Sequence, residues 1–203
     1  MKKIIAPWMT THSRRKINPL ALRPEDVEIE DIAHALANVN RFNGHAIRPI
    51  SVAQHSVYAS YLCEGTGYEL QALLHDASEY LLGDVTKWLK QSEAFAGYRE
   101  IEERTQAAIY RRYGCPLEDG EPVKRADKLL VRWEAAQAFG ADFVIDDAHG
   151  EPIGYPAITE EERQLIGYWT YWSWEDAKRW FLTRYESCTK KGVSNGTLQV
   201  SQR

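Results

Sequence analysis

The chain has 203 residues and a formal net charge of −4, from 29 acidic and 25 basic residues. Its hydrophobic fraction of 44% and charged fraction of 27% are typical of a globular domain, and they exclude a collagen-like chain, a coiled coil and a wholly disordered protein. A chain of this length forms one large domain that needs no disulfide or metal in order to fold. The acidic balance argues against a stable nucleic-acid partner.

Cysteine use and apolar runs indicate the compartment. No apolar run approaches the roughly 18 residues that a membrane span needs. The apolar start of the chain is interrupted at Pro7 before it resembles a signal peptide. Cys63, Cys115 and Cys188 are odd in number and form no metal-type pair. We therefore expect a cytoplasmic protein with free thiols and no membrane partner.

The predicted elements, in chain order, are almost all helices. Residues 1–22 are predicted to be an extended segment or a short hairpin, because polar residues separate two short strand-like runs. Apolar residues then recur at intervals of three and four, with Gly or Pro at the ends of most runs. This pattern predicts helices over 24–39, 52–64, 69–82, 85–89, 95–113, 122–139 and 159–185, with a loop over 141–156 and a polar tail over 189–203.

The expected fold class is therefore all-α, with a single helical domain over residues 23–188. Four tryptophans, Trp169, Trp172, Trp174 and Trp180, fall on the last predicted helix. We expect them in the core or in a subunit interface, so a homo-oligomer is expected.

The segment from Leu74 to Asp84 carries the strongest chemical signal. Adjacent His75 and Asp76 on a helix project about 100° apart and can supply two ligands to one metal. Glu79 projects between them one turn further on, where a carboxylate can act on a water without being a ligand. Taken alone, the pair is better explained as ordinary polar residues on a helix surface.

Two further residues change that interpretation. His55 lies on the preceding predicted helix, and Asp127 lies on a later one. The order His, His-Asp, Asp on three helices resembles the metal signature of the HD-domain phosphohydrolases, over residues 29–130. The bacterial 5′-deoxynucleotidases are similar through Asn40-Arg41-Phe42, Ser51-Val52-Ala53-Gln54-His55, His75-Asp76-Ala77-Ser78-Glu79 and Gly83-Asp84-Val85, and phage and prophage HD hydrolases through Ile29–Leu36 and Arg41–His45.

The resemblance implies an HD-domain bundle that binds one divalent transition metal through His55, His75, Asp76 and Asp127. Two imidazoles and two carboxylates suit Co²⁺, Mn²⁺, Zn²⁺ or Fe²⁺ better than Ca²⁺. The resemblance also implies catalytic roles for two other carboxylates: Glu79 as the acid/base residue, and Asp84 facing the sugar or the leaving-group oxygen.

The loop before His55 is expected to bind the substrate. Arg41 resembles the phosphate-binding arginine of the family, and its guanidinium fits two phosphate oxygens at once. Phe42, where the deoxynucleotidases carry Trp, is predicted to stack on the base or sugar. His45 is a candidate phosphate contact.

The expected function is hydrolysis of small nucleotides. The favoured substrates are deoxynucleoside 5′-monophosphates, which would yield nucleoside and phosphate. One alternative is a phage-type deoxynucleoside triphosphate triphosphohydrolase, acting for example on dATP and releasing triphosphate. A second alternative is a non-catalytic nucleotide-binding module, although such a module has no need for Glu79 beside a full set of ligands.

Overall fold

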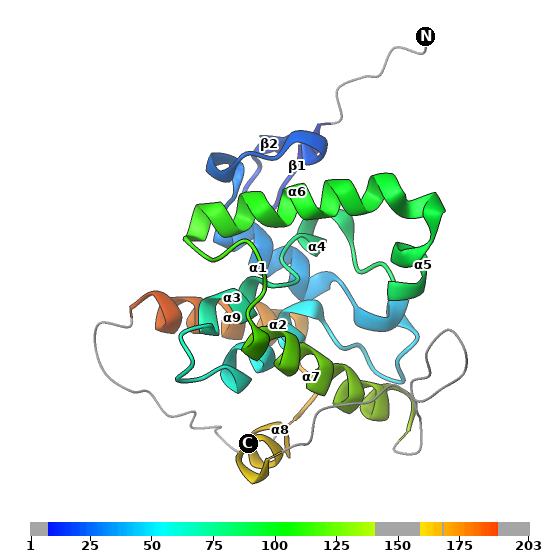
Figure 1. Ribbon diagram of the computed structural model, residues 1–203, viewed down its shortest axis with the longest axis vertical. Coiled ribbons are helices and arrows are strands. Elements are labelled where there is room, and N and C mark those ends of the chain that lie inside the picture. The colour runs from blue at the N-terminus through cyan, green and yellow to red at the C-terminus, as the bar shows by residue number, and fades with distance from the viewer. Residues whose placement is uncertain (1–7, 141–158, 168, 191–203) are drawn as a thin grey trace.

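The computed structural model describes residues 8–140, 159–167 and 169–190. The fold is mostly helical, with one small hairpin near the N-terminus, so the predicted all-α class is confirmed (Figure 1). Among the described helices, none has both the length and the apolar character needed to cross a membrane. The described elements are β1 Met9–Thr10, β2 Lys16–Ile17, η1 Pro19–Ala21, η2 Pro24–Asp26, α1 Ile29–Asn38, η3 Arg41–Gly44, α2 Val52–Leu62, α3 Glu69–Leu74, α4 Glu79–Leu82, α5 Lys87–Gln91, η4 Glu93–Phe95, α6 Ala96–Tyr113, α7 Glu121–Phe139, α8 Glu160–Gly167 and α9 Trp174–Thr189.

The predicted N-terminal hairpin is present and docks on α1. β1 and β2 are antiparallel, with Met9 opposite Ile17, and the Ile17 side chain is buried. In the turn between the strands, the backbone N–H and the hydroxyl of Ser13 both donate to buried Asp31 of α1, at 2.6 and 2.8 Å. These bonds satisfy a carboxylate that would otherwise be costly to bury. Of the segments predicted above, residues 1–7, the whole 141–156 loop and most of the C-terminal tail lie outside the described residues.

Helix α2 lies at the centre of the molecule. Its residues from Val52 to Ser60 are all buried, and it contacts α1, α3, α7 and α9. The Ser51 hydroxyl accepts a hydrogen bond from the Gln54 N–H, so the predicted N-cap of this helix is confirmed. A helix buried on all sides has to present its polar residues to partners within the protein. His55, in the middle of α2, is one of these polar residues.

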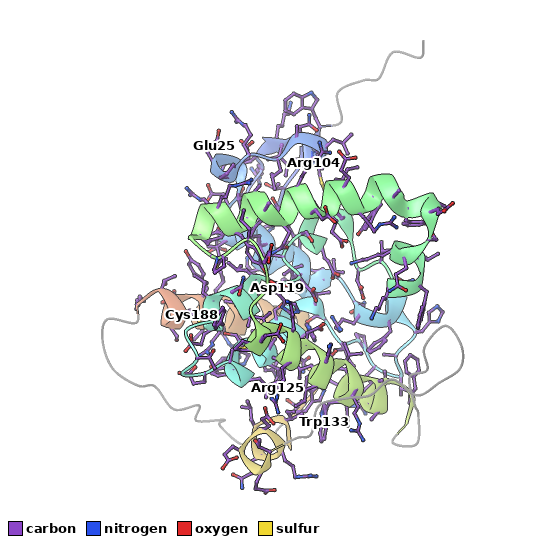
Figure 2. The ribbon with its side chains drawn as sticks, in the orientation of Figure 1. Glu25, Arg104, Asp119, Arg125, Trp133 and Cys188 are labelled. Carbon is purple, nitrogen blue, oxygen red and sulfur yellow. The ribbon has the colours of Figure 1, made fainter. Side chains whose placement is uncertain are left out.

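Helices α6 and α7 lie on opposite sides of α3, which contacts both (Figure 1). The main core is formed by apolar side chains of α1, α2, α3, α6 and α9, among them Leu36, Val57 and Phe181. A second apolar cluster lies between α2, α3 and α7. Arg125 on α7 pairs with Glu162 on α8, on the side of α7 that faces α8 (Figure 2).

The prediction of a single helix over 159–185 was wrong, because the structure has two helices there, α8 and α9, and residues 169–173 before α9 are not helical. The rings of Trp169 and Trp172 in this connection stack on Tyr58 of α2, with centroids 4.6 and 5.5 Å apart. Buried Gln54 of α2 binds the backbone carbonyl of Thr170 and the N–H of Trp172. These contacts with α2 therefore stabilise the break more than the backbone hydrogen bonds of a continuous helix would stabilise the alternative.

Trp169 and Trp172 thus lie in the segment between α8 and α9 and not on a helix. Trp172 and Trp180 pack against the main core, as predicted, whereas Trp174 at the start of α9 is 46% exposed. The Ser173 hydroxyl caps α9 by accepting from the Asp176 N–H. The stretch predicted as helix from Pro24 also divides, into the 3-10 turn η2 and helix α1.

Candidate metal centre

The predicted helix over 69–82 is interrupted at His75–Ser78, and this correction concerns the candidate site directly. α3 ends at Leu74 and α4 begins at Glu79. The intervening residues form tight turns, with the Ala77 N–H donating to the Leu74 carbonyl at 3.0 Å. Gln106 of α6 holds both sides of the break: its amide nitrogen donates to the Leu74 carbonyl at 2.7 Å, and its amide oxygen accepts from the Ser78 N–H at 2.9 Å.

The structure brings the four predicted metal ligands together. His55 Nε2 and His75 Nε2 are 3.2 Å apart. Asp76 Oδ2 lies 3.3 Å from His75 Nε2 and 3.6 Å from His55 Nε2. Asp127 Oδ1, from α7, lies 3.4 Å from His55 Nε2 and 3.9 Å from His75 Nε2. His55, His75 and Asp76 form a group whose ligand atoms all lie within 4.8 Å of one another.

The hydrogen bonds of the two imidazoles direct their Nε2 lone pairs inward. His75 Nδ1 lies 2.8 Å from the Ala72 carbonyl, and His55 Nδ1 lies 2.9 Å from Glu134 Oε1. A carbonyl and a carboxylate both accept, so each Nδ1 carries a proton, and each ring in its neutral form keeps its lone pair on Nε2. Two lone pairs that face each other need a shared electrophile, either a proton or a cation.

The spacing of these atoms fits a divalent cation. Ligands bound at about 2.0–2.2 Å lie roughly 3.0–3.6 Å apart in octahedral or tetrahedral geometry, and most of the separations above fall in that range. Burial alone would lower the pKa of His75, but Asp76 and Asp127 outweigh it and raise that pKa to about 10. The centre therefore attracts positive charge strongly. The donor set fits the predicted transition metal.

Arg41 lies at the edge of this group. Its backbone N–H donates to the Ile50 carbonyl, and its buried guanidinium places NH1 3.3 Å from Asp76 Oδ2. The next two residues, Phe42 and Asn43, have positive φ values of 57° and 49°. The left-handed region is uncommon for phenylalanine, and residues held in it cluster at active sites and ligand-binding loops.

Glu134 is a site residue that the sequence analysis missed. Its side chain, on α7, is fully buried, and its Oε2 lies 2.7 Å from Arg41 Nε. It follows Asp127 by seven residues, which is two helical turns and places both carboxylates on one face of α7. That spacing, on a helix with a buried apolar face, was the signal available in the sequence.

The two predicted catalytic carboxylates lie beside the centre. Glu79 is buried, and among the described residues its Oε2 has no hydrogen-bond partner. Burial, followed by the charges of Asp76 and Asp84, raises the pKa of Glu79 well above its usual value. Burial also raises the pKa of Asp84, against the lowering effect of Arg41. Glu79 is therefore suited to hold a proton.

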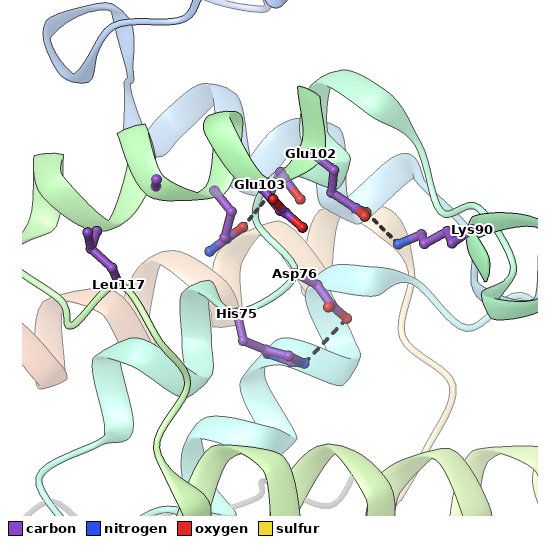
Figure 3. A pocket seen from close by; sticks show the side chains of 9 residues that line it. His75, Asp76, Lys90, Glu102, Glu103 and Leu117 are labelled. Carbon is purple, nitrogen blue, oxygen red and sulfur yellow. Dashed lines mark hydrogen bonds and ion pairs between the residues drawn. The ribbon is translucent and has the colours of Figure 1, made fainter. Parts of the chain in front are cut away.

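A pocket of about 330 Å³ opens beside His75 and Asp76 (Figure 3). Lys90 of α5 lines it, with its ammonium 2.5 Å from Glu102 Oε1 and 3.5 Å from Glu79 Oε1. The remaining lining residues are Ser78, Glu103, Gln106, Ala107 and Leu117. A cationic side chain thus enters a polar pocket directly beside the candidate centre.

The two other predicted substrate contacts lie outside the described lining of this pocket. The ring of Phe42 packs edge-on against Phe139 at the end of α7, with centroids 5.3 Å apart. His45 follows the turn at Arg41–Gly44 and is exposed. Their roles in substrate binding stay predictions.

The fold and the site define a mostly helical protein with a partly buried cluster of candidate metal ligands. No family model matches the chain. It is 39% identical over 158 residues to the uncharacterized protein RCAP_rcc00048 of Rhodobacter capsulatus, covering 71% of this chain and 80% of the relative. It is 36% identical over 138 residues to the uncharacterized protein YfdR of Escherichia coli K12, covering 67% and 73% respectively. The chain belongs to the family that contains these two proteins.

Proposed function

We propose that this protein is a divalent-metal-dependent phosphohydrolase of the HD-domain type that acts on small nucleotides. The favoured substrates are deoxynucleoside 5′-monophosphates, which yield nucleoside and phosphate. The observation that carries the proposal is the convergence of His55, His75, Asp76 and Asp127 from separate parts of the chain. Glu79, which is buried beside them, supplies the acid/base group that a binding module would not need.

The open side of the centre faces solvent. His55 is fully buried, whereas the side chains of Asp76 and Asp127 are 25% and 40% exposed. A phosphate group can therefore approach from the side of the two carboxylates, where a bound dication would offset their charge. When bound, the dication orients the phosphate and increases the acidity of the attacking water.

Arg41 and Glu79 have distinct tasks in this mechanism. Arg41 binds phosphate oxygens through the part of its guanidinium that Glu134 does not hold. Glu79, whose pKa burial raises, donates a proton to the nucleoside oxygen as the phosphorus–oxygen bond breaks. It then takes up the proton that the attacking water releases, which returns the carboxyl group to its starting state. Asp84 is assigned to the sugar side of the substrate.

The experiment is a panel of deoxynucleoside mono- and triphosphates and ribonucleotides, each incubated with Mn²⁺ or Co²⁺ and analysed by chromatography. Nucleoside plus phosphate is the expected outcome. Nucleoside plus triphosphate would replace the proposal by the triphosphohydrolase. If purified, folded protein turns over none of these substrates with either metal, the enzymatic proposal fails and the nucleotide-binding module replaces it. The His75→Ala variant, prepared in parallel, controls for contaminating phosphatases.

A further inference from the structure

Glu134 occupies a place between the candidate metal centre and the predicted phosphate-binding arginine. Its side chain is 0% exposed. One carboxylate oxygen, Oε1, lies 2.9 Å from His55 Nδ1, and the other, Oε2, lies 2.7 Å from Arg41 Nε. Each oxygen therefore faces one nitrogen from a different functional group.

These contacts belong to a closed ring of four side chains. Arg41 NH1 lies 3.3 Å from Asp76 Oδ2, and that oxygen lies 3.6 Å from His55 Nε2. The ring thus passes from Glu134 through Arg41 and Asp76 to His55 and back to Glu134. Two of its members are candidate metal ligands and one is the candidate phosphate contact.

The position of Glu134 needs an acceptor on both side-chain oxygens. Arg41 Nε always donates, and His55 Nδ1 must donate if its Nε2 is to keep a lone pair for a metal. A side-chain amide would turn its NH₂ group toward one of these two donors. If the NH₂ group faced His55 Nδ1, the imidazole of His55 would carry its proton on Nε2 instead. A proton on Nε2 blocks metal binding.

We propose that Glu134 is a positioning residue that holds His55 in its metal-binding tautomer and holds Arg41 in its phosphate-binding orientation. The inference rests on the proposed function, because it assigns Glu134 a task at the same centre. Carboxylates that accept from the outer nitrogen of a metal-binding histidine typically change metal affinity 10- to 100-fold when they are mutated.

A purely structural role for Glu134 makes a different prediction. If the carboxylate only neutralises buried Arg41, its loss lowers thermal stability but leaves the tautomer of His55 and the metal affinity of the folded protein unchanged. The test therefore needs a readout at His55 itself.

The variant is Glu134→Gln, and the matched control is Glu69→Gln. Glu69 is also a buried carboxylate, but it accepts from the Gly65 N–H at 2.8 Å, away from the centre. Zinc affinity is measured by calorimetry on both variants and on the wild type. The ring nitrogens of His55 are followed by ¹⁵N NMR in the metal-free and zinc-loaded proteins, and the resonances are assigned with His55→Asn.

We expect Glu134→Gln to bind zinc at least 10-fold more weakly than the wild type and to show a proton on Nε2 of His55, while Glu69→Gln matches the wild type. Wild-type affinity and an unchanged His55 signal in folded Glu134→Gln would overturn the inference and leave the proposed function standing. Absence of zinc, Mn²⁺ and Co²⁺ binding by the wild type would instead overturn the proposed function, and the inference with it. If Glu134→Gln does not fold, Glu134→Asp retains the charge on a side chain too short for both contacts, and affinity equal to the wild type then overturns the inference.

Discussion

At the scale of single residues, the candidate centre depends on which nitrogen of each histidine is free. The Nδ1 atoms of His55 and His75 are engaged, so both Nε2 atoms point toward the same place. His34 on α1 shows the contrast, because its ring stacks on His12 with centroids 3.7 Å apart. A stacked pair of parallel rings does not aim two lone pairs at one point. The same residue type thus has a binding geometry in one place and a packing geometry in the other.

Removal of one inward-facing imidazole should remove the metal. We expect His75→Ala to lose both bound metal and hydrolysis, because it removes one of the four candidate ligands and half of the imidazole donors. Exposed His45 offers a matched control, and His45→Ala should retain the metal. Elemental analysis of both purified variants provides the measurement. Full occupancy in His75→Ala would show that the centre has been assigned wrongly.

Mutation of Glu79 should impair catalysis without impairing metal binding. Glu79→Gln cannot transfer a proton but retains nearly the same volume, so we expect kcat to fall by about 10²-fold or more with metal content unchanged. Steady-state kinetics and elemental analysis check the two halves of this prediction. Loss of the metal in Glu79→Gln would make Glu79 a ligand, and the proposed proton transfer would have to be assigned to another group.

At the scale of elements, the break between α3 and α4 determines where His75 and Asp76 lie. A continuous helix would present both residues on the surface of one regular cylinder. Gln106 stabilises the break instead, because its amide has one donor and one acceptor and binds a backbone group on either side. Gln54 holds the α8–α9 connection in the same manner. In both cases a side chain from a neighbouring helix replaces hydrogen bonds that a continuous helix would make.

Loss of the Gln106 side-chain amide should weaken the candidate centre, although Gln106 is not itself a predicted ligand. Gln106→Leu leaves the Ser78 N–H without its partner and leaves the Leu74 carbonyl with the Ala77 N–H alone. A buried group left unsatisfied costs about 1–3 kcal/mol. We expect lower thermal stability together with weaker metal binding, since both ligands lie within the released turn. Gln164→Leu, on the exposed face of α8, controls for the loss of an amide. A variant that is destabilised but binds metal as the wild type does would show that the turn holds its shape without Gln106.

At the scale of the whole molecule, the candidate centre joins segments that are distant in the chain. His55 comes from α2, His75 and Asp76 from the α3–α4 turn, and Asp127 from α7. Because α2 is central and contacts both α3 and α7, the packing of the core assembles the ligands. Four ligands from three segments exist at this spacing only in the folded state. Metal binding and folding are therefore expected to be coupled.

This coupling predicts a shift in thermal unfolding. A ligand that binds only the folded state contributes about 2.7 kcal/mol at a hundred times its Kd. For a chain of this size that corresponds to a rise in Tm of roughly 5–10 °C. Calorimetry of the chelator-treated protein with and without added Mn²⁺ or Co²⁺ measures the shift. The same shift in His75→Ala would mean that the stabilising metal binds elsewhere.

The sequence by itself determined the helical class, the N-terminal hairpin and the cap at Ser51, because apolar periodicity and turn residues are local patterns. The four candidate ligands were expected from the resemblance to the HD-domain phosphohydrolases, because the spacing of His75 and Asp76 alone points to no more than one pair. The sequence could not determine the two helix breaks or the role of Glu134. The Trp169–Trp172 connection is held by Tyr58 and Gln54, and the His75–Ser78 turn by Gln106, in each case from another helix. Glu134 acquires its partners only when α7 packs beside α2 and the Arg41 loop. Hydrogen bonds and ring contacts between distant segments decided these features, and such interactions leave no periodic signal in the chain.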